Sequence, residues 1–313
     1  MKKIALLFAG QGAQYVGMGK DLAETYPVVA GLYLRADEVL GRSMSAIAFE
    51  GPEEVLTKTM HCQPALYIHG LACLAALNEE VGELTVAAAA GLSLGEFTAH
   101  TAAGTFDFDA GLQLVAARAD FMQQACEATS GAMAAMIGAD ENAVRDLAAQ
   151  TDVDIANLNC PGQVVISGEA TKVALAVSLA QEAGVRRAAT LNVAGAYHSR
   201  LMKSAYEKLA VVLEETPMSI PRFPVVCNID ALPVVDAARI RETLREQVTG
   251  TVRWQESIEH LADHEKIELF IELGPGKVLA GLASRIRKEV PTISITDTAS
   301  LKAAAERLKS LIV

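Results

Sequence analysis

Ser93 has the surroundings that most clearly predict covalent chemistry. It is the centre of a G-x-S-x-G pattern that follows a short apolar run and precedes a helical stretch, Gly91-Leu92-Ser93-Leu94-Gly95. At such a strand-to-helix elbow the serine backbone is strained, its hydroxyl projects over the end of the sheet, and the next amide can bind an oxyanion. We therefore expect Ser93 to be a nucleophile and the Leu94 amide to be an oxyanion donor. The alternative is an ordinary glycine-rich turn between a strand and a helix.

A nucleophilic serine needs a general base, and the chain has six histidines. His198 lies between an expected strand and an expected helix, near the positive end of that helix's macrodipole, which favours the neutral imidazole that a base requires. A structural capping role is the alternative. His260 and His264 are four residues apart, but the H-E-x-x-H pattern and a third ligand are missing, so we expect a solvated helix face there. The others are His61, His69 and His100.

Arg118 suggests that the substrate carries an anionic group. By helical spacing it shares a face with apolar residues, Leu114, Val115, Phe121 and Met122. An arginine on an apolar stripe is costly to bury without an anion. It could grip a substrate carboxylate with two hydrogen bonds. A buried structural ion pair or a side chain that reaches out to solvent explains the position equally well.

The first glycine-rich loop does not predict a nucleotide site. Gly10-Gln11-Gly12-Ala13-Gln14 begins like a dinucleotide fingerprint, but Tyr15 occupies the place of the third glycine and no Walker lysine follows. The loop is either a plain turn or a second donor to an oxyanion.

The order of the expected elements predicts an α/β fold with a mostly parallel sheet. Short apolar runs at 4–8, 86–90 and 269–273 read as buried strands, and the second precedes helical stretches at 94–103 and 110–127. A long apolar helix is expected from Pro64 to Leu77, with the proline at its start. The five cysteines, Cys62, Cys73, Cys126, Cys160 and Cys227, show no pairing pattern, which is typical of reduced thiols in a cytoplasmic protein.

A different pattern occupies residues 129–196. Strands are expected at 132–137, 154–158, 163–167 and 188–193, with a turn at 159–162 and helices at 141–150 and 170–183, the second ending at Gly184. This βαββαβ order predicts a ferredoxin-like unit. We therefore expect a small inserted domain at 129–196 and a large, α/β-hydrolase-like catalytic domain formed by 1–128 and 197–313.

Composition excludes several function classes. The 313 residues are 51% hydrophobic, enough for a full core, and the formal net charge of −11 disfavours a nucleic-acid surface. The apolar N-terminal run stops too early for a signal peptide, and nothing approaches a membrane span. We expect a cytoplasmic protein that is a monomer and has neither a nucleic-acid nor a membrane partner.

Several motifs together resemble the malonyl-CoA:acyl-carrier-protein transacylase family over nearly the whole chain. They occur in this order: Phe8-Ala9-Gly10-Gln11-Gly12-Ala13-Gln14, Gln63-Pro64-Ala65-Leu66, Gly91-Leu92-Ser93-Leu94-Gly95-Glu96-Phe97, Arg118 with Met122, Pro161-Gly162-Gln163-Val164-Val165-Ile166-Ser167-Gly168, His198-Ser199, and Glu272-Leu273-Gly274-Pro275-Gly276.

The resemblance implies a role for each matching residue. Ser93 would attack the malonyl thioester of coenzyme A and His198 would take its proton. The backbone carbonyl of Gln247 would orient the histidine in place of a triad carboxylate, and the amides of Gln11 and Leu94 would form the oxyanion hole. Arg118 would hold the free malonyl carboxylate. The acyl group would then pass to the phosphopantetheine thiol of acyl carrier protein, in fatty-acid biosynthesis or in a polyketide pathway, with no metal or redox cofactor.

Leu92 departs from the family, which usually has histidine before the serine; this affects the polarity of the pocket. Tyr197 is bulky and would crowd an α-methyl group, so we expect malonyl to be preferred over methylmalonyl. Because carrier proteins of this kind are acidic, docking needs a basic patch. The candidates are Arg285, Arg287 and Lys288, with Arg186 and Arg187, although a solvated helix end is an equal reading.

Three other functions compete with this one. A serine hydrolase would use a later acid and histidine, for example Asp230 or Asp236 with His260 or His264. A proofreading acyl hydrolase of the same fold is closer, but such relatives tend to lose the carboxylate-binding arginine. A nucleotide-binding scaffold would use the loop at 10–19 and leave Ser93 inert.

Overall fold

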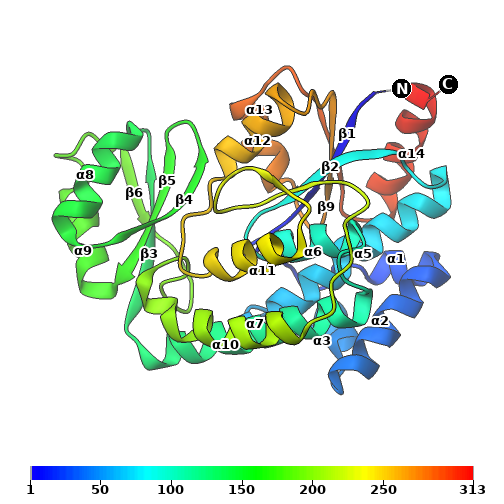
Figure 1. Ribbon diagram of the computed structural model, residues 1–313, viewed down its shortest axis with the longest axis horizontal. Coiled ribbons are helices and arrows are strands. Elements are labelled where there is room, and N and C mark those ends of the chain that lie inside the picture. Colours follow the sequence, from blue (N-terminus) through cyan, green and yellow to red (C-terminus); the bar gives the residue numbers. More distant parts are fainter. Residues whose placement is uncertain (1, 313) are drawn as a thin grey trace.

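The computed structural model describes residues 2–312 and contains two separate sheets (Figure 1). The larger sheet has the strand order β10-β9-β1-β2-β7-β8, and its pairs are parallel except for β7 with β8. Its strands are β1 (Ile4–Phe8), β2 (Val86–Gly91), β7 (Val225–Val226), β8 (Pro233–Val234), β9 (Leu269–Leu273) and β10 (Thr292–Ile295). The expected α/β fold with a mostly parallel sheet is confirmed.

Strand β1 shows why this sheet forms. All five of its residues are buried. Leu6 and Phe8 belong to one apolar cluster, whereas Ala5 and Leu7 belong to a second one. Because successive side chains of a strand point to opposite faces, an uninterrupted apolar run indicates a sheet covered on both sides.

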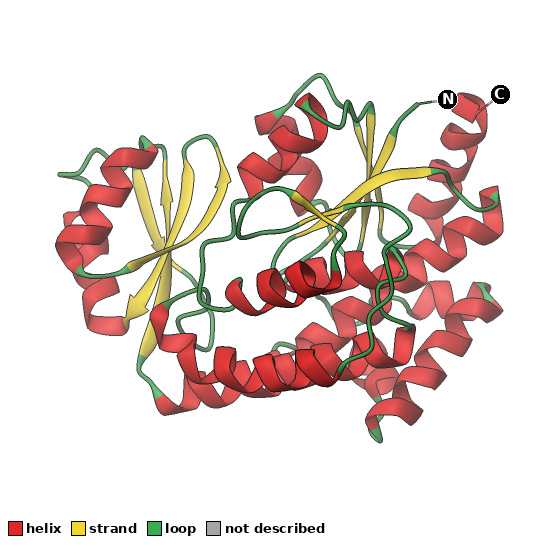
Figure 2. Ribbon diagram, in the orientation of Figure 1, coloured by secondary structure: helices red, strands yellow, loops and turns green. Residues whose placement is uncertain are grey.

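Helices cover both faces of the sheet (Figure 2). Most of them contribute to the cluster that contains Leu6, while α12 and α13 cover the face of Leu7. None of the helices in residues 2–312 is long and apolar enough to cross a membrane. The helices outside the smaller sheet are α1 (Lys20–Thr25), α2 (Pro27–Leu40), α3 (Met44–Glu50), α4 (Glu53–Leu56), α5 (Thr59–Val81), α6 (Leu94–Ala102), α7 (Phe108–Ala128), α10 (Lys203–Glu215), α11 (Ala237–Glu246), α12 (Trp254–Asp263), α13 (Val278–Ile286) and α14 (Thr298–Ile312).

Helix α5 corrects one expectation. It begins at Thr59, so Pro64 lies inside the helix instead of at its start. A proline in a helix leaves the carbonyl four residues earlier without its usual partner. Here the guanidinium of Arg42 donates a hydrogen bond to that carbonyl, on Met60, at 2.9 Å. A contact from 18 residues away compensates for the proline, which local sequence rules could not predict.

The smaller sheet is antiparallel, with the order β4-β5-β3-β6, and lies at one end of the molecule (Figure 1). Its strands are β3 (Gly131–Ile137), β4 (Asp154–Cys160), β5 (Gln163–Glu169) and β6 (Arg187–Thr190). Helices α8 (Glu141–Thr151) and α9 (Ala170–Leu179) pack against it around an apolar cluster of its own. All these elements fall within residues 129–196, while the exact division into domains stays a prediction.

Three boundaries differ from those expected in this region. Helix α9 ends at Leu179 and not at Ala183, because the chain then tightens into turns, such as the one from the amide of Gly184 to the carbonyl of Gln181. The turn after β4 is shorter than expected, since the strand continues to Cys160. Strand β6 ends at Thr190, and residues 191–193 leave the sheet to line a cavity.

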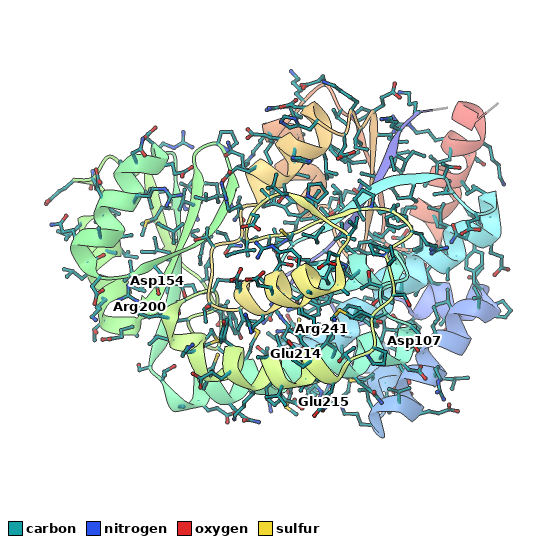
Figure 3. The ribbon with its side chains drawn as sticks, viewed as in Figure 1. Asp107, Asp154, Arg200, Glu214, Glu215 and Arg241 are labelled. Carbon is teal, nitrogen blue, oxygen red and sulfur yellow. The ribbon has the colours of Figure 1, made fainter. Side chains whose placement is uncertain are left out.

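The connection from the smaller sheet back to the larger unit carries an ion pair. Arg200, in the short 3₁₀ helix Arg200–Met202 before α10, donates to the carboxylate of Asp154 at the start of β4, with an Nη2–Oδ1 distance of 2.7 Å (Figure 3). This pair is exposed and contributes little to stability. It does fix where the chain passes immediately after His198.

Candidate active site

Ser93 lies at a sharp elbow between β2 and α6. Its backbone has φ 54° and ψ −106°, in a region that L-residues rarely adopt. The glycines on either side are required by close packing. A Cβ on Gly95 would lie 2.2 Å from the carbonyl oxygen of Phe8, and one on Gly91 would lie 1.9 Å from the backbone of Gly95. The flanking glycines therefore allow the elbow to pack against the end of β1.

Asn228 holds this elbow in place. Its Oδ1 accepts a hydrogen bond from the Ser93 amide at 2.7 Å, and its Nδ2 donates to the Gly91 carbonyl at 2.8 Å. Asn228 follows β7, the strand next to β2, by two residues. The side chain thus bridges the carboxyl ends of two parallel strands and stabilises the strained backbone of Ser93.

The Ser93 hydroxyl and the His198 imidazole form a hydrogen-bonded pair. The distance from Ser93 Oγ to His198 Nε2 is 2.8 Å, and that from His198 Nδ1 to the carbonyl oxygen of Gln247 is 2.7 Å. Because a carbonyl can only accept, Nδ1 carries the proton and Nε2 is free to accept the serine proton. The structure therefore brings together three residues that are far apart in the sequence.

Burial, assisted by the nearby charge of Arg118, lowers the pKa of His198 to about 4. The imidazole is therefore neutral at pH 7, which is the form that a general base requires. The neutral form was expected from a helix macrodipole, but the helix after His198 begins only after a 3₁₀ turn, and desolvation by burial is the larger cause.

The other five histidines lie away from Ser93. His100 is buried and bonds Thr105 through Nδ1 at 3.1 Å, and His69 is buried beside Tyr33 and Cys73. The rings of His260 and His264 stack on each other at the end of α12. None of these, nor His61, is among the described residues that line the cavity at Ser93.

The acids of a conventional triad are occupied elsewhere. Asp230 forms an ion pair with Arg239, and Asp236 caps α11 by accepting a hydrogen bond from the backbone amide of Arg239 at 3.0 Å. The hydrolase arrangement that would join either acid to His260 or His264 is therefore not assembled here.

Arg118 lies in the same site and is 1% exposed. Its Nη1 donates to Gln63 Oε1 at 2.5 Å, and its Nη2 donates to Gln247 Oε1 at 2.9 Å and to Ser93 Oγ at 3.0 Å. The guanidinium also lies over the ring of Phe97, 5.2 Å from its centroid. Arg118 is thus held by neutral partners directly beside the serine hydroxyl.

The charge of Arg118 has no close counter-ion. Within residues 2–312, no carboxylate oxygen lies at ion-pair distance from its guanidinium, and Nε has no hydrogen-bond partner. Burial lowers its pKa to about 10, so the side chain still carries its charge at pH 7. A buried, unpaired cation attracts an anionic group. The structure therefore rules out the buried ion pair and the solvent-reaching side chain that the sequence left open.

A cavity of about 260 Å³ opens over Ser93 between the two sheets. Gln11 and Leu94 line it from the large unit, and Asn157 and Leu191 line it from the small one. Among the described residues, neither the backbone amide of Gln11 nor that of Leu94 donates a hydrogen bond within the protein. Both amides are therefore available to a bound group.

The comparisons with known proteins agree with this geometry. The model of the acyl transferase domain matches residues 5–301. The malonyl CoA-acyl carrier protein transacylase of Bacillus subtilis (strain 168) is 43% identical, over 99% of this chain and 98% of that protein. The crystal structure of acyl-carrier-protein-S-malonyltransferase from Bartonella henselae has a TM-score of 0.93 and 37% identity, covering 98% of this chain and 99% of that one.

A further solved structure holds a malonyl-transacylase in complex with its type II polyketide-synthase acyl-carrier protein. It has a TM-score of 0.92 and 40% identity, covering 97% of this chain and 99% of that one. The chain belongs to the malonyl-CoA:acyl-carrier-protein transacylase family. The resemblance read from the sequence motifs is thereby confirmed, and the protein is an acyltransferase.

The candidate site contains three residues to which the sequence motifs assigned no role. Gln63 and Glu96 lie inside motifs that carry the resemblance, and both are buried. Asn228 lies outside them. Its position just past the carboxyl end of a short apolar strand is the signal that could have indicated it, because binding residues gather at that edge of parallel sheets.

Leu92 and Tyr197, the two residues expected to affect the polarity and the width of the pocket, also line the cavity. Leu92 is half-buried and packs against Gly10, where an added Cβ would approach Leu92 Cδ2 to 2.8 Å. Tyr197, which directly precedes His198, lines the cavity and bonds the hydroxyl of Thr59. Their positions make the wall near Ser93 bulky and largely apolar.

Proposed function

We propose that this acyltransferase moves a malonyl group from malonyl-CoA to the phosphopantetheine thiol of an acyl carrier protein through an ester on Ser93. The observation that carries the proposal is the buried guanidinium of Arg118, which has no carboxylate partner and donates a hydrogen bond to the nucleophile at 3.0 Å. A malonyl group has a thioester carbonyl to be attacked and a free carboxylate to be held. Acetyl has only the first.

In the acylation step, Ser93 Oγ attacks the thioester carbonyl while its proton passes to His198 Nε2. The Nδ1–H of His198 stays on the carbonyl of Gln247, which stabilises the imidazolium that forms. The backbone amides of Gln11 and Leu94 donate hydrogen bonds to the developing oxyanion. Collapse of the tetrahedral intermediate breaks the carbon–sulfur bond, and the coenzyme A thiolate leaves with the proton from His198.

The second half-reaction reverses these roles. The carrier-protein thiol gives its proton to His198, and its sulfur attacks the ester carbonyl of malonyl-Ser93. The carbon–oxygen bond then breaks and Ser93 regains its proton from the imidazolium. One site therefore serves two thiols in turn, which predicts ping-pong kinetics.

Tyr197 supports a preference for malonyl over methylmalonyl. Its ring lines the cavity next to the base and is held by the contact between its hydroxyl and that of Thr59. An α-methyl group would have to displace this ordered side chain. Equal kcat/KM for the two thioesters would contradict the preference.

We also propose a finer description of the fold of the two units. The smaller unit has the element order βαββαβ and the strand order β4-β5-β3-β6, both of which support a ferredoxin-like insert at 129–196. A parallel sheet with a serine elbow after β2 supports an α/β-hydrolase-like catalytic domain. Removing residues 129–196 as a unit would then leave a large domain that folds but lacks one wall of its cavity.

Intact-protein mass after brief mixing with malonyl-CoA tests the proposed function. We expect one malonyl adduct on the wild-type protein, little with acetyl-CoA, and none on Ser93→Ala. Coenzyme A released steadily without an adduct would instead indicate a hydrolase. The absence of both an adduct and turnover would contradict the catalytic role of Ser93.

The pathway is a separate question. The relatives include an enzyme described with a type II polyketide-synthase carrier protein, so a role in polyketide synthesis is the second candidate beside fatty-acid synthesis. Transfer rates measured with carrier proteins of both kinds distinguish the two.

A further inference from the structure

Glu96 is a buried carboxyl group that the proposed mechanism does not use. It lies in the first turn of α6, three residues after the nucleophile, and it is 0% exposed. Its Oε2 accepts a hydrogen bond from Gln247 Nε2 at 2.7 Å and another from the backbone amide of Asn228 at 2.9 Å. Its Oε1 has no partner among the described residues. Both hydrogen bonds of the carboxyl group therefore go to residues that touch the active-site groups.

The contact with Gln247 determines which way that side-chain amide points. With Nε2 donating to Glu96 and, at 3.3 Å, to the Ser93 carbonyl, the oxygen Oε1 is directed to Arg118. If the amide turned over, its NH₂ group would face the guanidinium, and two donors would oppose each other. Arg118 would then lose one of the neutral acceptors that hold it.

We propose that Glu96 is a positioning residue that fixes the orientation of the Gln247 amide and thereby holds Arg118 ready for the substrate carboxylate. This inference rests on the proposed function. It assigns to Glu96 a part in selecting malonyl over acyl groups without a carboxylate, because only a carboxylate makes use of Arg118.

The serine–histidine pair is held by other contacts. The carbonyl of Gln247 that orients His198 belongs to the backbone. This backbone is fixed by the hydrogen bond from the backbone N–H of Gln247 to the Thr243 carbonyl at 3.0 Å. The backbone of Asn228 is also held by Arg253, whose amide donates to its carbonyl at 2.9 Å. Loss of the Glu96 carboxyl should therefore affect carboxylate recognition more than acyl transfer itself.

Glutamine is the matched replacement. Burial raises the pKa of Glu96 to about 8, so the carboxyl group is largely neutral at pH 7. The amide of Glu96→Gln can present its oxygen to both donors at the place of Oε2, whereas Glu96→Leu keeps the approximate size and removes the acceptor. The first variant should keep the orientation of Gln247 and the second should lose it.

The experiment measures kcat/KM for malonyl-CoA and for acetyl-CoA on each variant. We expect Glu96→Leu to lower the malonyl-to-acetyl ratio by about ten-fold or more, which is the effect of losing one hydrogen bond to a charged group. Glu96→Gln should keep the ratio within about three-fold of wild type. An unchanged ratio in Glu96→Leu, or an equal loss in both variants, would overturn the inference.

Two further variants separate positioning from simple loss of stability. Glu272, a buried carboxyl group that accepts from the amides of Leu279 and Ala280, provides the control: Glu272→Leu should lower stability and leave the ratio unchanged. Gln247→Met removes the side-chain amide that Glu96 acts through and should lower the ratio as Glu96→Leu does. If Glu96→Leu does not fold, an unchanged ratio in Gln247→Met overturns the inference.

The proposed function fails in a different way. A wild-type protein that forms no malonyl ester contradicts the function, and the inference with it. If the wild-type protein forms the ester but the malonyl-to-acetyl ratio of kcat/KM is the same in Glu96→Leu as in wild type, only the inference about Glu96 is contradicted.

Discussion

At the residue scale, burial lowers the pKa of both Arg118 and His198, yet at pH 7 it leaves the first side chain charged and the second neutral. The arginine remains charged because its pKa, lowered to about 10, is still far above 7. The histidine remains neutral because burial and the neighbouring arginine keep its pKa at about 4. One buried site thus holds a charged guanidinium beside a neutral imidazole.

Arg118→Ala should abolish selectivity for the carboxylate. The proposed charge-assisted contact with malonyl is worth about 1.5–3 kcal/mol, so kcat/KM for malonyl-CoA should fall by at least ten-fold while that for acetyl-CoA changes less. Steady-state kinetics with both thioesters measure this. Retained preference for malonyl-CoA would show that another group binds the carboxylate.

The acylation rate should depend on pH through His198. A protonated imidazole cannot accept the serine proton, so the rate should stay constant from pH 7 to about 5 and fall as pH drops through about 4. Arg118→Ala removes a charge that lowers this pKa and should move the midpoint upward. Rapid-quench acylation after a pH jump gives the profile, and a wild-type midpoint near the ordinary value of 6.5 would contradict the proposed environment.

At the element scale, the strands and the serine elbow could be predicted from the sequence because their signals are local. Apolar runs that end in glycine mark β1 and β2, and G-x-S-x-G marks the turn after β2. The role of Asn228 could not be predicted, because it depends on β7 pairing with β2 across more than a hundred residues. The same limit applies to Pro64 inside α5, where the Met60 carbonyl that the proline leaves free is bonded by Arg42.

Arg42→Met tests that last contact. It removes the donor that bonds the Met60 carbonyl, the group left free by Pro64, and should lower the free energy of unfolding by about 1 kcal/mol. Urea denaturation followed by circular dichroism measures the change. Arg307→Met, at an exposed position on α14, is the control and should change stability by less than about 0.5 kcal/mol. Equal effects of the two substitutions would refute the compensation at Pro64.

At the scale of the whole molecule, two units each provide one wall of the cavity. Ser93 and Arg118 come from elements around the larger sheet, and His198 comes from the segment that leads back to it, while Asn157 and Leu191 come from the smaller unit. The net charge of −11 means that an acidic carrier protein must approach a local cluster of positive charge. Helix α13 is a suitable place, because Val278 and Leu282 line the cavity.

The structure distinguishes two of the basic residues proposed for docking. Arg287 forms ion pairs with Asp263 and Glu259, whereas no ion pair within residues 2–312 involves Arg285, which donates a hydrogen bond to Gln163 at 3.4 Å. Arg285→Glu should therefore raise KM for the carrier protein several-fold and leave acylation by malonyl-CoA unchanged. Arg287→Glu should have the smaller effect on that KM. The reverse order in transfer assays at low salt would exclude Arg285 as the docking residue.

The proposed mechanism requires that malonyl-Ser93 is the species that delivers the acyl group. The most direct measurement isolates the malonylated protein free of coenzyme A, adds phosphopantetheinylated carrier protein, and follows both intact masses with time. We expect the malonyl mass to leave the enzyme and appear on the carrier protein at a rate no slower than steady-state turnover. A stable adduct, or malonate released to water while the carrier protein stays unmodified, would contradict it.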